Sequence, residues 1–99
     1  MNVVLRPEAV DDLHAALTHY AEIDAALARD FAEELDLLID RLQMFPRSGR
    51  PVEELSEVRR GRLRRFPYGV FYRVTADEIR ILRVLHAARD RPPLSDADE

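Results

Sequence analysis

The residues best suited to bind an anion are arginines in the second half of the chain. Arg60, Arg62 and Arg64 alternate with Gly61 and Leu63, and in an extended strand this spacing places the three arginines on one face. A guanidinium is planar and donates several hydrogen bonds, so it can hold a phosphate or a carboxylate by two bonds at once. The pattern predicts a basic strand that binds an anionic partner. The alternative is a solvated strand edge, which such charges protect from unwanted pairing.

Three more arginines, Arg73, Arg83 and Arg89, fall in or just after the next two predicted strands. We expect Arg73 and Arg83 to extend the basic surface of the sheet. Arg83 lies among aliphatic residues, where a charge requires a partner. That partner is expected to be Glu78 or a carboxylate of a bound protein.

Two other side chains complete the candidate site. Phe71 and Tyr72 are neighbours in one strand and must face opposite sides of the sheet; we expect Tyr72 to contact a partner. His86 ends the last predicted strand and is the remaining candidate for proton transfer. The chain contains fifteen arginines and no lysine, and an arginine stays charged at neutral pH. The alternative role for His86 is a hydrogen bond at the strand end. His14 and His19, five apart on a helix, do not form a metal site, so neither metal nor cofactor is expected.

Two amphipathic helices are predicted upstream of these strands. Residues 2–5 form a short strand, and Pro7 suits the first turn of a helix that ends near Ile23. Asp24 is placed to cap a second helix, which Pro46 ends. Apolar residues recur at steps of three and four along both helices, which predicts one buried face on each. These residues are Val10, Leu13, Leu17 and Tyr20 in the first helix, and Leu27, Phe31, Leu35, Leu38, Leu42 and Phe45 in the second.

A loop-like segment, residues 46–57, separates the helices from three further strands. The element order β-α-α-β-β-β predicts an α+β domain over residues 1–91, with a helical hairpin packed on a small, mostly antiparallel sheet. Residues 92–99 are polar and acidic and are expected to form a flexible tail. The three strands are expected at residues 58–66, 68–75 and 79–86.

Charge is divided unevenly along the chain, whose formal net charge is −4 at pH 7. Residues 1–45 carry three arginines and ten carboxylates, whereas residues 46–94 carry twelve arginines and six carboxylates. This predicts an acidic helical layer and a basic sheet that meets a polyanion or an acidic protein. No segment is long and apolar enough to span a bilayer, and there is no signal-peptide core and no cysteine, so we expect a cytoplasmic protein.

Five short motifs follow one another along the chain. They are Ala9-x-x-Asp12-Leu13 with Tyr20, Ala28-x-x-Phe31, Phe45-Pro46-x-x-Gly49-Arg50-Pro51, RRFPYGVFYRV at residues 64–74, and ILRVLHAARD at residues 81–90. Together they resemble the RelE/ParE toxins, and most closely the ParE-like branch. The resemblance covers Leu5 to Asp90 and implies the RelE/ParE toxin fold. It also implies the toxin of a bacterial type II toxin–antitoxin system, in a hetero-oligomer with a ParD-like antitoxin that neutralises it.

The resemblance leaves two targets open: DNA gyrase, which ParE-like toxins poison, and ribosome-bound mRNA, which RelE-like toxins cleave. Arg60 and Arg62 align with two lysines of the RelE-like enzymes, and Arg89 aligns with their arginine after the last strand. However, Gly69 stands where those enzymes carry a phosphate-clamping arginine, and no tyrosine follows Arg89. The set of nuclease residues is therefore incomplete.

We expect a ParE-like toxin that binds and poisons DNA gyrase without catalysis. One alternative is a metal-independent endoribonuclease in which Arg62 and Arg89 hold the phosphate and His86 transfers the proton. Another is an inactive relative that binds only its antitoxin. The residues expected to bind antitoxin or target are Arg60, Arg62, Arg64, Tyr72, Arg73, Arg83, His86 and Arg89.

Overall fold

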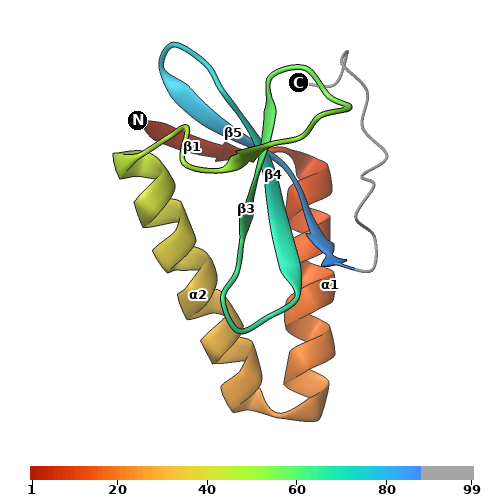
Figure 1. Ribbon diagram of the computed structural model, residues 1–99. Coiled ribbons are helices and arrows are strands. Elements are labelled where there is room, and N and C mark those ends of the chain that lie inside the picture. The colour runs from red at the N-terminus through yellow and green to blue at the C-terminus, as the bar shows by residue number, and fades with distance from the viewer. Residues whose placement is uncertain (88–99) are drawn as a thin grey trace.

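The computed structural model describes residues 1–87 and shows two helices against a five-stranded sheet (Figure 1). The α+β order predicted from the sequence is confirmed, with one addition: a two-residue strand lies within the segment expected to be a loop. Arg89 and the acidic tail, residues 92–99, lie outside the described residues. The elements are β1 (Asn2–Leu5), α1 (Pro7–Ile23), α2 (Ala25–Met44), β2 (Arg50–Pro51), β3 (Val58–Arg62), β4 (Tyr68–Val74) and β5 (Glu78–His86).

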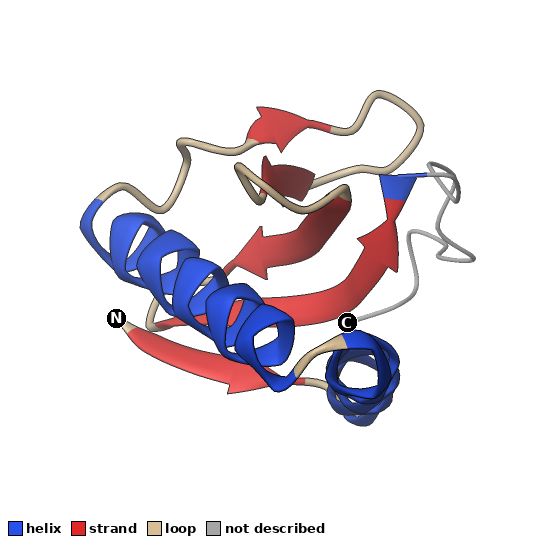
Figure 2. Cartoon of the chain, turned by 90° about the horizontal axis from the view of Figure 1, so that it is seen from below, coloured by secondary structure: helices blue, strands red, loops and turns tan. Residues whose placement is uncertain are grey.

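The sheet is mixed, with strands in the order β1-β5-β4-β3-β2. β1 is parallel to β5, and the other neighbours are antiparallel. Both helices lie against the same face of the sheet (Figure 2), because a hairpin of two amphipathic helices buries its joint apolar surface on one layer. Within residues 1–87 neither α-helix covers the opposite face, which we call the open face.

Local signals set the helix boundaries. Pro7 is the first residue of α1, where its fixed φ and missing N–H suit the helix. Asp24 ends α1 and caps α2, because its Oδ1 accepts a hydrogen bond from the Ala26 N–H at 2.9 Å. Most of the predicted apolar stripe is at least half-buried, but Val10 and Phe45 are exposed. Phe45 lies just beyond the end of α2, so helical periodicity no longer directs its side chain inward.

Aromatic rings fill the space between the helices and the start of β4. Tyr20 of α1 and Phe31 of α2 meet Phe66 and Tyr68, with ring centroids between 5.0 and 6.2 Å apart. All but the tilted Tyr20–Phe31 pair are edge-to-face, an arrangement that stabilises a core beyond its apolar burial. The cluster fixes Tyr68, and therefore the start of β4, on the helix side of the sheet.

β3 is shorter than predicted, and Glu34 of α2 explains the difference. The strand was expected over residues 58–66 but ends at Arg62. The Glu34 carboxylate accepts hydrogen bonds from the backbone N–H groups of Arg64 (2.8 Å) and Arg65 (2.9 Å), and from the Arg65 guanidinium. Burial alone would raise the pKa of Glu34, but these bonds outweigh it and lower the pKa. The carboxylate thus turns the chain out of the strand.

Candidate functional site

The open face carries the predicted basic strand. On β3, Arg60 and Arg62 stand opposite Phe71 and Gly69 of β4. Phe71 belongs to an apolar cluster separate from the core beneath the helices, so this register places both arginines on the open face. Arg50 of β2 pairs with Arg60 from the other side. We call Arg50, Arg60 and Arg62 the arginine face.

Arg60 lies across the neighbouring strand. Its guanidinium carbon is 5.9 Å from the centroid of the Phe71 ring, within the range of a cation–π contact. Its aliphatic stem crosses Gly69, where an added Cβ would stand 3.0 Å from the Arg60 Cδ. An arginine at position 69, as in the RelE-like enzymes, would have to push Arg60 aside. The stem of Arg60 therefore occupies the space that the phosphate-clamping arginine would need at position 69.

Arg64 does not extend the alternation of Arg60 and Arg62, and that prediction is wrong. It lies beyond the end of β3, and its backbone N–H is bound to Glu34. Its side chain is exposed in the connection between β3 and β4.

Arg73 lies on the open face at the far end of β4. It pairs with Val58 of β3 and Arg80 of β5, and its Nη1 donates to the Ser56 carbonyl at 2.7 Å. Arg73 therefore ties the loop before β3 to the sheet. Arg80 is bound to Glu78, with Nη2 and Oε2 2.9 Å apart, so Glu78 is not the partner of Arg83.

Tyr72 was expected to contact a partner, and this prediction is wrong. Its side chain is fully buried in the core beneath the helices, and its hydroxyl accepts a hydrogen bond from the Gly49 N–H at 2.9 Å. Burial raises the pKa of Tyr72, although the Gly49 bond and nearby arginines oppose the shift. A Cβ at Gly49 would collide with the Tyr72 ring, so the glycine allows the loop after α2 to approach the sheet.

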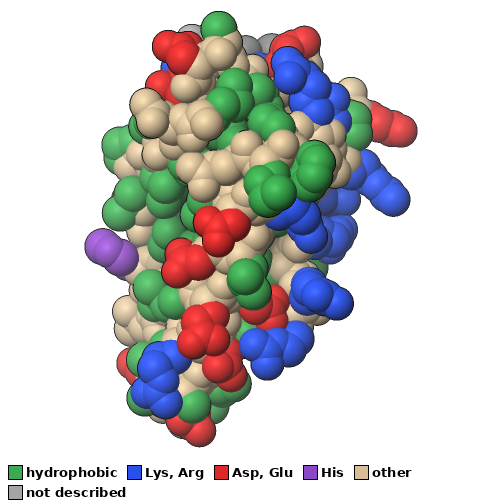
Figure 3. Space-filling model, turned by 90° about the vertical axis from the view of Figure 1, so that its left-hand side faces the viewer, with side chains coloured by type: hydrophobic (Ala, Val, Ile, Leu, Met, Phe, Trp, Pro, Cys, Tyr) green, Lys and Arg blue, Asp and Glu red, His purple; other side chains and the backbone are tan. Residues whose placement is uncertain are grey.

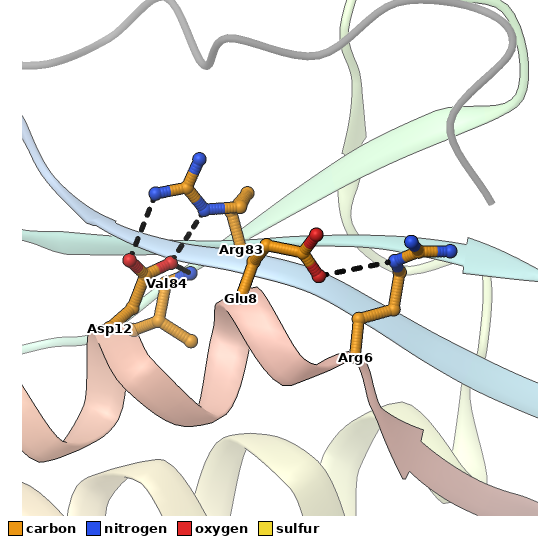
Figure 4. A network of polar contacts seen from close by, with 5 residues as sticks. All are labelled: Arg6, Glu8, Asp12, Arg83 and Val84. Carbon is orange, nitrogen blue, oxygen red and sulfur yellow. Dashed lines mark hydrogen bonds and ion pairs between the residues drawn. The ribbon is translucent and has the colours of Figure 1, made fainter.

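Arg83 is bound to Asp12 of α1 (Figure 4). Two parallel bonds join them, from Nε to Oδ2 at 2.8 Å and from Nη2 to Oδ1 at 2.9 Å. The Val84 N–H also donates to Oδ2 at 2.9 Å. The hydrogen bond to Asp12 raises the pKa of Arg83 despite its partial burial. The expectation that Arg83 pairs with Glu78 or a foreign carboxylate is therefore wrong, because this arginine ties α1 to β5.

His86 lies beside a groove between α1 and the end of β5. Its ring meets the edge of Tyr68 with centroids 5.3 Å apart, and Tyr68 packs beneath the helices. His86 therefore points to the helix side, whereas Arg62 projects from the open face. The groove has a volume of about 320 Å³ and is lined by Asp12, Ala15, Ala16, Tyr68, Val84, Leu85 and His86.

On the face shown in Figure 3, carboxylates lie over the middle and most of the arginines lie along the right-hand side. Arg59 of β3 pairs with Tyr72 and donates through Nη1 to the carbonyls of Arg47 (3.1 Å) and Gly49 (2.9 Å). No group of His, Asp and Glu side chains suited to a metal ion occurs within residues 1–87. In the same part of the chain, no helix has the length and apolarity to cross a membrane.

Two acidic residues that position the site, Asp12 and Glu34, were not predicted from the sequence. A signal for them exists in the helical spacing. Asp12 follows the buried Ala9 by three residues, and Glu34 follows the buried Phe31 by three. A carboxylate at such a position shares the inward face of its helix and must find partners there.

Comparisons with known proteins agree with this architecture. Over residues 3–91 the sequence matches the family described as ParE toxin of type II toxin-antitoxin system, parDE. Among solved structures, the fold is similar to a chain of the chromosomal ParDE TA system from P. aeruginosa, with a TM-score of 0.75 and 29% sequence identity. That match covers 87% of this chain and 95% of the other. No match is found among curated proteins.

Proposed function

The chain belongs to the ParE toxin family of type II toxin–antitoxin systems, and we propose that it binds DNA gyrase and poisons it without catalysing a reaction. We propose further that a ParD-like antitoxin forms a hetero-oligomer with it and neutralises it. Both events take place in the bacterial cytoplasm.

The separation of Arg62 from His86 carries the choice of a binding mechanism. Metal-free RNA cleavage requires a phosphate clamp and a proton-transferring group around a single phosphate. Arg62 belongs to the open face, and His86 contacts Tyr68 on the helix side. Gly69, crossed by the stem of Arg60, takes the place of a second clamping arginine. These positions favour a surface that binds over one that cleaves.

Two surfaces, one on each side of the sheet, suit an antitoxin. The arginine face offers guanidiniums that bind carboxylates through paired hydrogen bonds. The groove beside α1 combines Ala15, Ala16 and Val84 with the polar His86, a mixture that suits one face of an amphipathic helix. An acidic amphipathic segment could therefore use both surfaces.

Purified gyrase provides the test of the target. The wild-type chain is expected to block supercoiling of relaxed plasmid and to trap cleaved DNA. Replacing Arg60 and Arg62 by glutamine is expected to raise the toxin concentration needed to block supercoiling. The increase is about tenfold for each lost contact that contributes about 1.4 kcal/mol. Arg29→Gln, an exposed change on α2, serves as the matched control and is expected to behave as wild type.

Cells that express the chain alone distinguish the other functions. Gyrase poisoning predicts DNA damage with intact mRNA. Cuts in translated mRNA without any effect on gyrase would overturn the proposal in favour of the nuclease. Normal growth, together with retained antitoxin binding, would indicate an inactive relative.

A further inference from the structure

We propose that a pocket beside the loop after α2 binds a phosphate group that keeps a proton, as inorganic phosphate does at neutral pH. Arg47 and Arg59 bind the phosphate oxygens, and Glu57 accepts a hydrogen bond from the P–O–H group. This site does not depend on which macromolecule the toxin attacks.

The pocket lies between the loop after α2 and the hairpin of β2 and β3, and its volume is about 350 Å³, a size typical of small-molecule sites. Arg59 pairs with Tyr72, whose side chain lies beneath the helices, so Arg59 points away from the arginine face. The three charged residues of the lining are Arg47, Glu57 and Arg59. The others are apolar: Pro51, Leu55, Val58 and Val74.

Arg59 is already oriented for a further acceptor. Its Nη1 donates to the carbonyls of Arg47 (3.1 Å) and Gly49 (2.9 Å), and these two bonds hold the guanidinium in place. Within residues 1–87 its Nε and Nη2 groups donate to no other atom. Together these two groups form a rigid fork that matches two oxygens of a phosphate.

Arg47 provides the second cation. Its carbonyl contacts the Arg59 guanidinium, so the two residues adjoin at the pocket. Its side chain is exposed, and among the described residues its guanidinium has no hydrogen bond or ion pair. One arginine can satisfy both oxygens of a carboxylate, whereas a phosphate has further oxygens for a second arginine. The pair therefore favours a phosphate over a carboxylate.

Glu57 occupies a backbone conformation that disfavours its side chain. Its φ is 66°, and in the described part of the chain no other residue besides glycine has a positive φ. Strained residues of this kind cluster at functional sites, so a glutamate at this position indicates that its side chain is used. A carboxylate only accepts hydrogen bonds. It therefore repels an anion unless the anion brings a proton of its own.

This lining predicts which anions enter. Inorganic phosphate can donate its P–O–H to Glu57 while its other oxygens accept from Arg47 and Arg59. Sulfate has the same tetrahedral shape but no proton at neutral pH, so its oxygens would meet the carboxylate without a hydrogen bond. The phosphodiester of a nucleic acid lacks the proton too. The pocket is therefore expected to take inorganic phosphate or the protonated head of a small phosphomonoester.

An NMR titration of the full chain tests the site. The probe is inorganic phosphate at neutral pH and constant ionic strength, with sulfate as the matched anion. We expect saturable shifts of the amide signals of Glu57, Val58 and Arg59 with phosphate. Sulfate should bind at least about tenfold more weakly, because one charge-assisted hydrogen bond is lost. Equal affinity for the two anions, or shifts that do not saturate, would overturn the proposal.

Arg47→Gln tests the clamp. It is expected to weaken phosphate binding about tenfold, and the spectrum should stay folded because this guanidinium binds nothing else within residues 1–87. Arg29→Gln removes the same charge from an exposed position on α2. This control should change the affinity by less than about twofold, since a distant exposed charge is screened. An affinity that Arg47→Gln leaves unchanged would count against the pocket.

Two substitutions of Glu57 test the selectivity. Glu57→Gln keeps the size of the side chain and supplies an N–H for sulfate. Glu57→Gly suits the positive φ, so a folding defect cannot explain its result. Both are expected to bring the affinities for phosphate and sulfate within about twofold of each other. A preference for phosphate that persists in both folded variants would overturn the proposal.

Two competitors identify the source of the phosphate. Ribose 5-phosphate carries a phosphomonoester, whereas dimethyl phosphate is a diester with no acidic proton at neutral pH. Ribose 5-phosphate that binds more tightly than inorganic phosphate points to a phosphorylated metabolite, and weaker binding points to free phosphate; either order supports the site. Dimethyl phosphate that binds as tightly as inorganic phosphate would overturn it. None of these assays contains gyrase or an antitoxin, so their outcome is separate from that of the proposed function.

Discussion

Removing the negative charge of Asp12 is expected to loosen α1 from β5. The side chains of Asp12 and Arg83 are only 14% and 19% exposed. Breaking a fully buried ion pair by removing one partner costs about 3–5 kcal/mol, whereas an exposed pair contributes about 0–1 kcal/mol. The low exposure places this pair near the buried limit, so Asp12→Asn is expected to lower the free energy of unfolding by about 3 kcal/mol. Asp12→Ala also leaves the Val84 N–H without its acceptor, which adds about 1 kcal/mol.

Equilibrium urea unfolding, followed by circular dichroism, measures these losses. Figure 4 contains the matched control, the pair of Arg6 and Glu8, whose charged atoms are 3.6 Å apart and whose side chains are 36% and 56% exposed. Glu8→Gln is expected to cost less than about 0.5 kcal/mol. A double-mutant cycle with Arg83→Met isolates the coupling between Asp12 and Arg83. The reasoning is refuted if Asp12→Asn costs less than about 1 kcal/mol, or no more than Glu8→Gln.

Three further perturbations test other contacts. Folding lowers the pKa of Glu34, so its charge stabilises the fold above its ordinary pKa of 4.5, and this contribution is lost as the pH falls below that value. The difference in unfolding free energy between wild type and Glu34→Gln, measured by urea unfolding, should therefore become smaller as the pH falls below 4.5. A difference that stays constant with pH would contradict this role of Glu34. Tyr72→Phe removes the hydrogen bond from the Gly49 N–H and is expected to lower the free energy of unfolding by about 1–2 kcal/mol, measured by thermal unfolding. Gly49→Ala should lower it by more, because the added Cβ meets the Tyr72 ring. The reverse order would count against this packing. Gly69→Ala displaces only the flexible stem of Arg60, so it should lower the free energy of unfolding by less than about 1 kcal/mol. It should also shift the NMR signal of Phe71. An unchanged signal would mean that Arg60 does not cross β4.

The helices could be predicted closely because their signals are local. Pro7 marks the start of α1, and Asp24 marks both the end of α1 and the cap of α2. Each acts within one helical turn, so a short stretch of sequence contains the whole cause. The order of the strands likewise follows from runs of β-branched and aromatic residues.

The remaining features depend on residues far apart in the chain. β3 ends early because Glu34, thirty positions before Arg64, takes the N–H that the strand would have used. The partner of Arg83 is Asp12, which lies 71 residues away. Alternation predicted that Phe71 and Tyr72 face opposite sides, but both are aromatic, so the pattern could not indicate which of them faces the helices.

Of the candidate site, the sequence predicted the basic strand but not the grouping of its members. The alternation of Arg60 and Arg62 was sufficient to place them on one face. The sequence offered no comparable signal for Arg50, because its strand is only two residues long. Whether His86 and Arg62 share a face depends on strand pairing and on the Tyr68 contact, which composition does not reveal.

The parallel pairing of β1 with β5 has a consequence for the order of events during synthesis. Asn2 pairs with Glu78 and Leu5 with Ile81, so the first strand emerges from the ribosome long before its neighbour exists. At about 5–20 residues per second, β1 waits on the order of 4–15 s. The helical hairpin, whose contacts are local, can form during that interval with its apolar faces uncovered. A newly made chain therefore passes through an incomplete form in which the apolar faces of the helical hairpin are exposed to binding. Its sheet is completed only after the last strand has been made.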